Sequence, residues 1–258
     1  DALIVRSTKV PASVFEVANN LGLVIRAGAG YDTIDVAAAS ALGIPVANCP
    51  GMNAIAVAEL AWGLILSCDR RIPDQCADLR QSKWDKKNYS KAEGLYGRTM
   101  GIVGLGRIGL EVAKRATGFG MNVVAWGRNL TEEQATAQGV GWCRDLMNLV
   151  QMSDVISIHV SATPETRHLV NSEFCEAMKP GAILINTTRG SVVDEQAVAD
   201  AVQSKGIRAG LDVFENEPGS GETQFKGPIA HQQGVYGTHH VGASTNQAQS
   251  AIASEAVR

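Results

Sequence analysis

The sequence predicts an α/β protein built on a doubly wound parallel sheet. Short apolar runs that suit buried strands alternate along the chain with segments whose apolar residues recur at helical spacing. Polar residues capable of chemistry follow several of these runs directly, and ligands gather at such carboxyl ends of parallel strands. With 258 residues, the chain is long enough for one or two domains.

The start of the chain predicts a small α/β unit. Strands are expected over residues 1–7, 21–30 and 44–48, and helices over residues 10–19 and 32–42. Because a strand opens the chain at residue 1, we expect the beginning of this unit to be missing. We assign residues 1–51 and 243–258 to this smaller domain and residues 52–242 to a larger one.

A long apolar helix is predicted next, over residues 53–68, with Asn53 as its N-cap. It is apolar on nearly all faces, which favours deep burial or a subunit interface. The polar segment 69–98 then holds lysines near Trp84 and Tyr89, a pattern known from nucleic-acid binding, but acidic residues interleave with them. We interpret this segment as a solvated surface or a dimer arm, and we expect a homodimer.

The rest of the chain continues the alternation. Strands are expected over residues 101–103, 122–126, 155–160, 182–188, 209–214 and 234–238. Helices are expected over residues 107–119, 172–178 and 194–204, with another after Thr131 and a short strand and helix over 144–152. This succession favours a parallel sheet with helices on both faces.

The composition narrows the class of protein. A net charge of -3 gives no electrostatic footprint for nucleic acid or an anionic membrane. The five cysteines are scattered, so neither a disulfide framework nor a thiolate metal site is expected. The longest apolar stretch, residues 54–68, is interrupted by Glu59 and is too short to span a bilayer. We expect a cytoplasmic protein with no metal, no nucleic acid and no membrane among its partners.

A glycine-rich turn between a strand and a helix marks a nucleotide site of the Rossmann type. Gly104 permits the tight turn, Gly106 lets the backbone approach a pyrophosphate, and Gly109 lets the helix pack close to the strand. The pyrophosphate then lies at the positive end of the helix. The strand, turn and helix in succession therefore predict NAD or NADP as cofactor.

The residues at the end of the strand expected over 122–126 bear on the choice between NAD and NADP. An NAD site places an acidic residue near the end of this strand to bind the ribose hydroxyls. Here Gly127 leaves room and Arg128 offers a guanidinium that suits a 2'-phosphate. These two residues favour NADP, and the alternative is that Arg128 is an ordinary exposed loop arginine.

Three polar residues that follow predicted strands have the chemistry of a hydroxy-acid site. His240 suits the proton transfer that accompanies hydride transfer near neutral pH. Glu217 would orient the imidazole and raise its pKa, and Arg189 would hold a substrate carboxylate through paired hydrogen bonds. The same residues also suit structural roles, in a strand end, a turn and an exposed loop.

The same segments resemble the D-isomer-specific 2-hydroxyacid dehydrogenase family, in the same order and over essentially the whole chain. They are Gly104 to Gly109, Arg189 to Glu195, Leu211 to Phe214 with Glu217-Pro218, and His240 to Thr245. The resemblance implies a Rossmann domain with a smaller flavodoxin-like substrate domain. It further implies that Arg189 binds substrate, Glu217 supports the base and His240 is the general acid/base.

Further roles rest on the resemblance alone. The residues expected along the cofactor are Arg107, Ile108, Thr187, Thr188, Asp212, Gly242 and Ala243. The start is most similar to the D-3-phosphoglycerate dehydrogenase branch, in which Arg6 and Arg26 match arginines near the anionic substrate. Gly28, Ala29 and Gly30 would supply backbone amides to its carboxylate.

Two departures from the family pattern keep alternatives open. Gly127 in place of an acid resembles the NADPH-using glyoxylate and hydroxypyruvate reductases of the family, which gives the alternative to a phosphoglycerate dehydrogenase. His239 replaces the proline that commonly precedes the catalytic histidine, so the choice between His239 and His240 rests on the Val-Gly-Ala that follows. A third reading is an NAD(H)-sensing, corepressor-like binding protein, since fold does not fix function.

Overall fold

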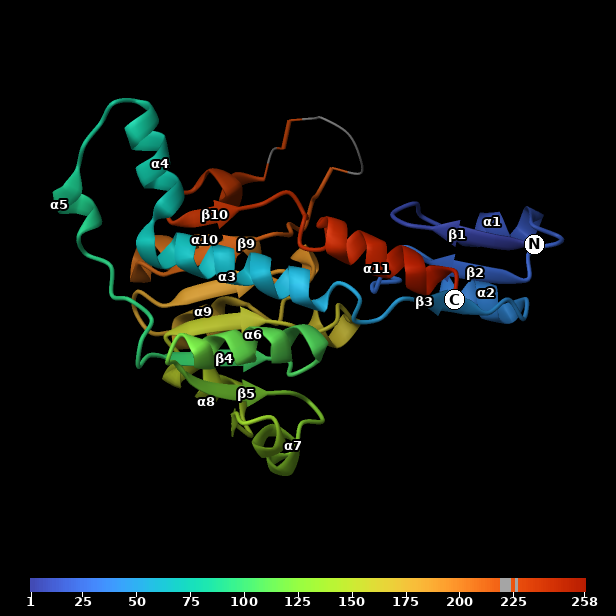
Figure 1. The fold of residues 1–258 in the computed structure, drawn as a ribbon, viewed down its shortest axis with the longest axis horizontal. Coiled ribbons are helices and arrows are strands. Elements are labelled where there is room, and N and C mark those ends of the chain that lie inside the picture. Colours follow the sequence, from blue (N-terminus) through green and yellow to red (C-terminus); the bar gives the residue numbers. More distant parts are fainter. Residues whose placement is uncertain (219–223, 226) are drawn as a thin grey trace. The chain divides into compact units, whose positions relative to one another are not determined.

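The computed structural model describes residues 1–218, 224–225 and 227–258 (Figure 1). Its contacts divide the chain into two compact units. Unit 1 comprises Asp1–Ala56 with Ala243–Arg258, and unit 2 comprises Val57–Gly242. The first division point lies just inside a helix, α3 (Ala54–Arg70), a few residues beyond the expected boundary after residue 51.

Unit 1 holds a three-stranded parallel sheet in the order β1-β2-β3. Its elements are β1 (Ala2–Val5), α1 (Ala12–Val17), β2 (Leu23–Arg26), α2 (Val36–Ala41), β3 (Val46–Asn48) and α11 (Asn246–Ala256). Phe15, Val24 and Ala39 form the centre of its apolar core. Helix α2 begins later than expected because Ile34 pairs with Val10 and Asp35 then caps the helix by accepting a hydrogen bond from the Ala38 N–H.

Helix α11 was missing from the sequence-based prediction. Its buried face holds a single large apolar residue, Ile252, between Ala248 and Ala256, so the periodic signal is weak. The Thr245 hydroxyl caps it by accepting a hydrogen bond from the Ala248 N–H. Ile252 and Ala256 pack against Cys49, which brings this last segment into unit 1.

Unit 2 is a seven-stranded parallel sheet in the order β10-β9-β8-β7-β4-β5-β6. Its strands are β4 (Thr99–Val103), β5 (Asn122–Trp126), β6 (Gly141–Trp142), β7 (Val155–Ile158), β8 (Ile183–Asn186), β9 (Arg208–Leu211) and β10 (Val235–Gly237). Successive strands run outward from β4 on one side and from β7 on the other. This reversal between β4 and β7 is the topological switch point, where doubly wound folds bind ligands, and it confirms the predicted fold class.

Helices cover both faces of this sheet. Besides α3, they are α6 (Arg107–Gly118), α7 (Glu132–Ala137), α8 (Leu146–Met152), α9 (Ser172–Ala177) and α10 (Glu195–Lys205). Two further helices, α4 (Ile72–Arg80) and α5 (Lys86–Tyr89), have no buried residue and extend beyond the sheet (Figure 1). One core cluster joins the sheet to α3, α6 and α7, and another joins it to α8, α9 and α10. Figure 1 shows α3 and α6 side by side, and the Trp62 indole N–H of α3 donates to the Val112 carbonyl of α6 at 3.2 Å.

Three central strands end earlier than predicted. β7, β8 and β9 end at Ile158, Asn186 and Leu211, and the polar residues that follow leave the sheet to form loops. The chain also contains the short 3-10 helices η1 (Pro164–Thr166), η2 (Gly190–Val192) and η3 (Pro228–His231). Among the described residues, no helix has the length and apolar character needed to cross a membrane.

Candidate active site

The glycine turn after β4 has the close contacts that its pattern predicts. Gly104 has a φ of +100°, and a Cβ there would lie 2.8 Å from the His159 carbonyl group. A Cβ on Gly109 would lie 2.2 Å from the Gly104 oxygen, so only glycine lets α6 start this close to the turn. A Cβ on Gly106 would meet nothing within 4 Å, which leaves the backbone open to an approaching group.

The N-terminus of α6 opens at the same place. The helix begins at Arg107 with Gly106 as N-cap, and no side chain caps it. The first N–H groups of a helix lack partners within the helix and, with the helix dipole, attract anions. The cradle at Gly106 and this uncapped end fit the pyrophosphate of a dinucleotide.

Two buried polar atoms at neighbouring strand ends are left without hydrogen-bond partners, namely Thr187 Oγ1 after β8 and His159 Nδ1 after β7. Buried polar atoms are nearly always paired, so such atoms mark places where a ligand or water completes the structure. Burial lowers the pKa of His159 to about 3, so its ring is neutral at physiological pH. Its Nε2 lies 2.8 Å from the Ser157 hydroxyl.

The residues that would meet the cofactor ribose lie after β5. A Cβ on Gly127 would approach Leu130 Cβ to 3.2 Å, and Arg128 is exposed. The pKa of the exposed Glu165 is lowered mainly by a hydrogen bond with Thr163 and by its own backbone, and the Arg128 charge contributes as well. The Arg128 charge thus acts on the Glu165 carboxylate.

The loop that carries Arg189 is held by Asn186, the fully buried last residue of β8. The Asn186 amide donates to the Arg189 carbonyl at 2.9 Å, and its oxygen accepts from the Thr188 N–H and hydroxyl at 3.0 and 2.8 Å. Arg189 Nη1 donates to the Thr188 carbonyl at 2.7 Å. Sequence reasoning missed this role of Asn186, whose only signal was a polar residue in an otherwise apolar strand.

Glu217 and His240 form a direct pair. His240 Nδ1 lies 2.7 Å from Glu217 Oε2, and the Phe214 N–H donates to Glu217 Oε1 at 2.9 Å. The hydrogen bond with Glu217 raises the pKa of His240 against the effect of burial, and the Glu217 charge adds to this rise. The Arg189 charge lowers the same pKa and the Asp212 charge raises it, both to a smaller extent. Burial alone would raise the pKa of Glu217, but the hydrogen bonds from His240 and Phe214 bring it below its ordinary value.

The buried carboxylate of Asp212 organises the loop around His240. It accepts hydrogen bonds from the Thr238 hydroxyl at 2.6 Å, the Val241 N–H at 2.9 Å and the Gly242 N–H at 2.8 Å. The His240 N–H donates to the Asp212 carbonyl at 2.7 Å, and His240 has a φ of +54°, unusual for a residue other than glycine. Asp212, expected along the cofactor, therefore also fixes the backbone of the acid/base residue.

The expected substrate residues lie in unit 1. Register pairs Val5 with Arg26, so Arg6 and Arg26 stand at the carboxyl ends of neighbouring parallel strands. Arg6 is exposed. Arg26 Nη1 donates to the Ala27 carbonyl at 2.8 Å, and the guanidinium occupies the space where a Cβ on Gly28 would stand.

The loop after β2 is fixed from the next strand. The amide of Asn48, at the end of β3, donates to the Ala29 carbonyl at 2.6 Å, and the Cys49 N–H donates to the Gly28 carbonyl at 3.0 Å. Sequence reasoning missed Asn48, which looked like an ordinary polar residue at a strand end. The structure thus brings Arg26 to Gly30 into one ordered loop, and it brings Arg189, Glu217 and His240 to the strand ends of unit 2.

The chemistry available in unit 2 follows from this geometry. With Nδ1–H donated to Glu217, the Nε2 atom of His240 is left to take a proton from a hydroxyl or return it to a carbonyl. The Glu217 carboxylate stabilises the charged imidazole, and Arg189 brings a positive charge to the same group of side chains. A bound nicotinamide dinucleotide supplies the two-electron redox chemistry that such a proton transfer accompanies.

Three features together are typical of a dinucleotide-binding oxidoreductase: the topological switch point, the glycine cradle and the His240–Glu217 pair. Residues 62–242 match the family model described as "D-isomer specific 2-hydroxyacid dehydrogenase, NAD binding domain". The chain belongs to the D-isomer-specific 2-hydroxyacid dehydrogenase family, as the sequence motifs predicted. The match also confirms the expectation of a nicotinamide dinucleotide as cofactor.

Nearly the whole chain aligns with related dehydrogenases and reductases. It is 44% identical to D-3-phosphoglycerate dehydrogenase of Methanocaldococcus jannaschii over 97% of this chain and 47% of that protein. It is 45% identical to hydroxypyruvate reductase of Thermotoga maritima over 100% of this chain and 82% of that protein. The chain thus spans about half the length of the phosphoglycerate dehydrogenases that it matches.

A solved structure supports the fold of the whole chain. D-lactate dehydrogenase from Aquifex aeolicus, complexed with NAD and lactic acid, superposes with a TM-score of 0.88 at 30% identity. The likeness covers 99% of this chain and 80% of that one.

Proposed function

We propose that this protein interconverts a small D-2-hydroxy acid and its 2-keto acid with NAD or NADP as the redox partner. The Glu217–His240 pair at 2.7 Å is the observation that carries this proposal. His240 acts as general acid in reduction and as general base in oxidation, while Glu217 holds the ring. Arg189 binds the substrate carboxylate and polarises the carbonyl.

The proposed substrate pair is D-3-phosphoglycerate and phosphohydroxypyruvate. Arg6 and Arg26 stand at adjacent strand ends in unit 1, which supports an anionic group on the substrate in addition to its carboxylate. Gly28, Ala29 and Gly30 follow directly. The Gly28 N–H donates to the Arg26 carbonyl at 2.8 Å, so the backbone N–H groups proposed for the substrate carboxylate are those of Ala29 and Gly30. The 44% identity to a D-3-phosphoglycerate dehydrogenase supports the same choice.

A second candidate is an NADPH-dependent glyoxylate or hydroxypyruvate reductase. Gly127 and the exposed Arg128 favour it, because a 2'-phosphate fits where the family's NAD enzymes would place an acid. The similarity to a hydroxypyruvate reductase over the full chain supports it equally.

Steady-state kinetics with NADH and NADPH, each paired with phosphohydroxypyruvate, hydroxypyruvate and glyoxylate, test both candidates. Preference for the phosphorylated acid supports the first, and loss of that preference in the Arg6→Ala and Arg26→Ala variants would assign the phosphate to these arginines. Preference for NADPH with an unphosphorylated acid supports the second. Absence of turnover with every pair, together with cofactor-dependent capture of peptide partners, would favour a corepressor-like sensor instead.

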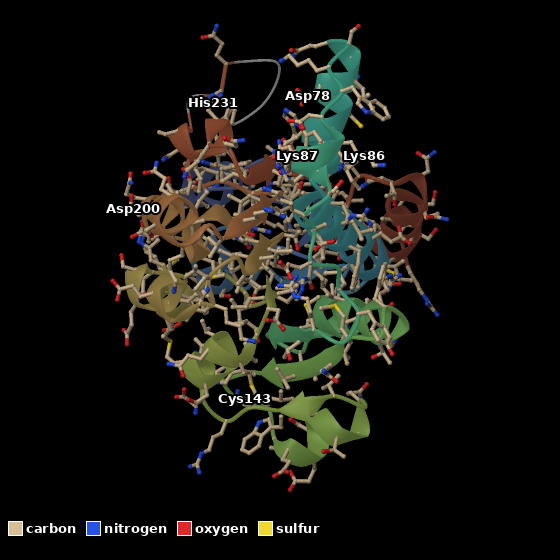
Figure 2. The ribbon with its side chains drawn as sticks, turned by 90° about the vertical axis from the view of Figure 1, so that its left-hand side faces the viewer. Asp78, Lys86, Lys87, Cys143, Asp200 and His231 are labelled. Atoms are coloured by element: carbon tan, nitrogen blue, oxygen red, sulfur yellow. The ribbon has the colours of Figure 1, made fainter. Side chains whose placement is uncertain are left out.

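We also propose a cytoplasmic homodimer. The segment around α4 and α5 exposes Ile72, Leu79, Trp84 and Tyr96, the last two at 81% and 88%. Among them lie charged side chains of both signs, including Asp78, Lys86 and Lys87, labelled in Figure 2. Exposed apolar side chains of this size are typical of protein interfaces. Sedimentation of the full-length gene product as a monomer would contradict the dimer.

A further inference from the structure

Glu215 lies two residues before Glu217, at the meeting point of three segments of unit 2. Its Oε1 atom is 2.7 Å from Arg167 Nη2 and 3.1 Å from His168 Nε2, which follow η1. The Glu215 N–H donates to Glu195 Oε1, in the first turn of α10, at 2.7 Å. The side chain and the backbone N–H of Glu215 are thus held by different segments of the chain.

The same segments are joined to the loop that carries Arg189. The His168 N–H donates to the Ser191 carbonyl at 2.9 Å, and His168 has the left-handed φ of +47°. A Cβ on Gly190 would lie 2.0 to 2.2 Å from the peptide between Phe214 and Glu215, so the two loops touch through their backbones. One packed cluster within unit 2 therefore contains residues 167–168, 189–191 and 214–217.

The contact between Gly190 and the Phe214–Glu215 peptide lies next to a backbone group that binds Glu217 of the Glu217–His240 pair. The Phe214 N–H, next to the peptide that Gly190 packs against, donates to Glu217 Oε1, and Glu217 Oε2 faces His240. A shift of the 214–215 backbone would change both hydrogen bonds of the Glu217 carboxylate.

We propose that Glu215 is a positioning residue that orients Glu217 toward His240 by anchoring the 214–217 turn to Arg167 and His168. It touches none of the reacting groups and acts through the turn. The inference rests on the proposed function for its catalytic consequence, since it assumes that Glu217 and His240 carry the proton transfer.

The Glu215→Ala variant removes the anchor and leaves the backbone hydrogen bond to Glu195. We expect kcat for reduction to fall roughly ten-fold, because small misplacements of catalytic groups are costly. The KM for the dinucleotide should stay unchanged, since the glycine cradle lies elsewhere in the unit. Glu215→Gln keeps an oxygen that can accept from Arg167 and His168 and should recover part of kcat. Glu176→Ala, which removes an exposed carboxylate from α9, is the matched control.

The titration of His240 gives a readout that a general loss of folding would not produce. Arg189, Asp212 and Glu217 are the charged groups that act on its ring. A weaker contact with Glu217 lowers the pKa of His240, so the midpoint in the imidazole NMR spectrum should move to lower pH in Glu215→Ala and partly return in Glu215→Gln. The His240→Gln variant identifies its signal among the five histidines.

A double-mutant cycle tests the route of the effect. Arg167→Ala should lower kcat in the wild-type background and have no further effect in Glu215→Ala, because its partner is already gone. An unchanged His240 midpoint in Glu215→Ala would overturn the proposal, even if the variant were less stable or less active. Because the titration needs no turnover, an inactive wild-type protein would contradict the proposed function and still leave this test decisive.

Discussion

The Nδ1 atom of His240 lies 2.7 Å from the Oε2 atom of Glu217, across 23 residues of sequence. The backbone of His240 is fixed at the same time by the buried Asp212, whose carboxylate binds the N–H groups of Val241 and Gly242. Ring and backbone are therefore held by different acidic residues. This division leaves the imidazole Nε2 as the atom available to a substrate.

The Glu217→Gln variant should shift the pH dependence of the reaction. The hydrogen bond with Glu217 raises the pKa of His240, so removing the charge lowers it. Reduction needs the protonated imidazole, and its rate falls as pH rises through this pKa. The falling limb of kcat/KM should therefore move to lower pH in the variant, and a limb at the wild-type position would contradict the assignment.

His239 provides a matched control for His240. Only His240 contacts Glu217 among the two adjacent histidines, both of which the structure describes. We expect His240→Gln to lower kcat by about 10²- to 10⁴-fold, the usual contribution of a general acid or base. His239→Gln should retain most of the activity. Equal losses in the two variants would show that the choice between them is wrong.

Alanine at Gly106 and at Gly109 should have different effects. A Cβ on Gly106 enters open space, so Gly106→Ala should keep the thermal stability and weaken dinucleotide binding by obstructing the cradle. A Cβ on Gly109 would lie 2.2 Å from the Gly104 oxygen, so Gly109→Ala should cost about 1–3 kcal/mol of folding stability. Thermal unfolding and cofactor titration by fluorescence separate the two. A destabilised Gly106→Ala protein would show that its space is not open.

Cofactor preference should depend on the residues after β5. If Arg128 binds a 2'-phosphate, Arg128→Gln should raise the KM for NADPH about ten-fold and leave that for NADH unchanged. Gly127→Asp should favour NADH, after a small movement of Leu130, whose Cβ would be 3.2 Å from the new Cβ. Glu165→Gln removes the carboxylate whose pKa the Arg128 charge lowers, so it should strengthen NADPH binding. Unchanged ratios in all three variants would place cofactor discrimination elsewhere.

His159 should make the native state sensitive to acid. The unfolded chain binds a proton on this residue near pH 6.5, whereas the buried ring does so only near its folded pKa of about 3. The free energy of unfolding should therefore fall as pH drops from 6.5 toward 3, at about 1.4 kcal/mol per unit once the unfolded form is protonated. The His159→Asn variant should show a shallower decline between these limits in urea unfolding. Equal slopes would mean that His159 is protonated in the native state.

Much of the fold could be predicted from the sequence because its signals are local. The apolar run into Gly104 and Gly106, followed by helical spacing, specifies a strand, a turn and a helix within residues 101–119. Helix α11 was not predicted because its buried face is mostly alanine, with Ile252 as its one large residue, and gives little periodic contrast. The strands predicted at β7, β8 and β9 extend too far at their carboxyl ends. The sequence pattern of an extended segment is the same whether or not a neighbouring strand pairs with it.

The sequence by itself determined the order of strands and helices, the glycine turn and the family to which the chain belongs, since each depends on residues close together or on motifs in order. Only the tertiary structure decided which of two adjacent histidines meets Glu217. It also revealed that Asn186 binds the loop of Arg189, that Asp212 binds the backbone after His240, and that Glu215 pairs with Arg167. The partners of Asp212 and Glu215 lie in other segments of the chain, and hydrogen bonds of this kind leave no periodic pattern in the sequence.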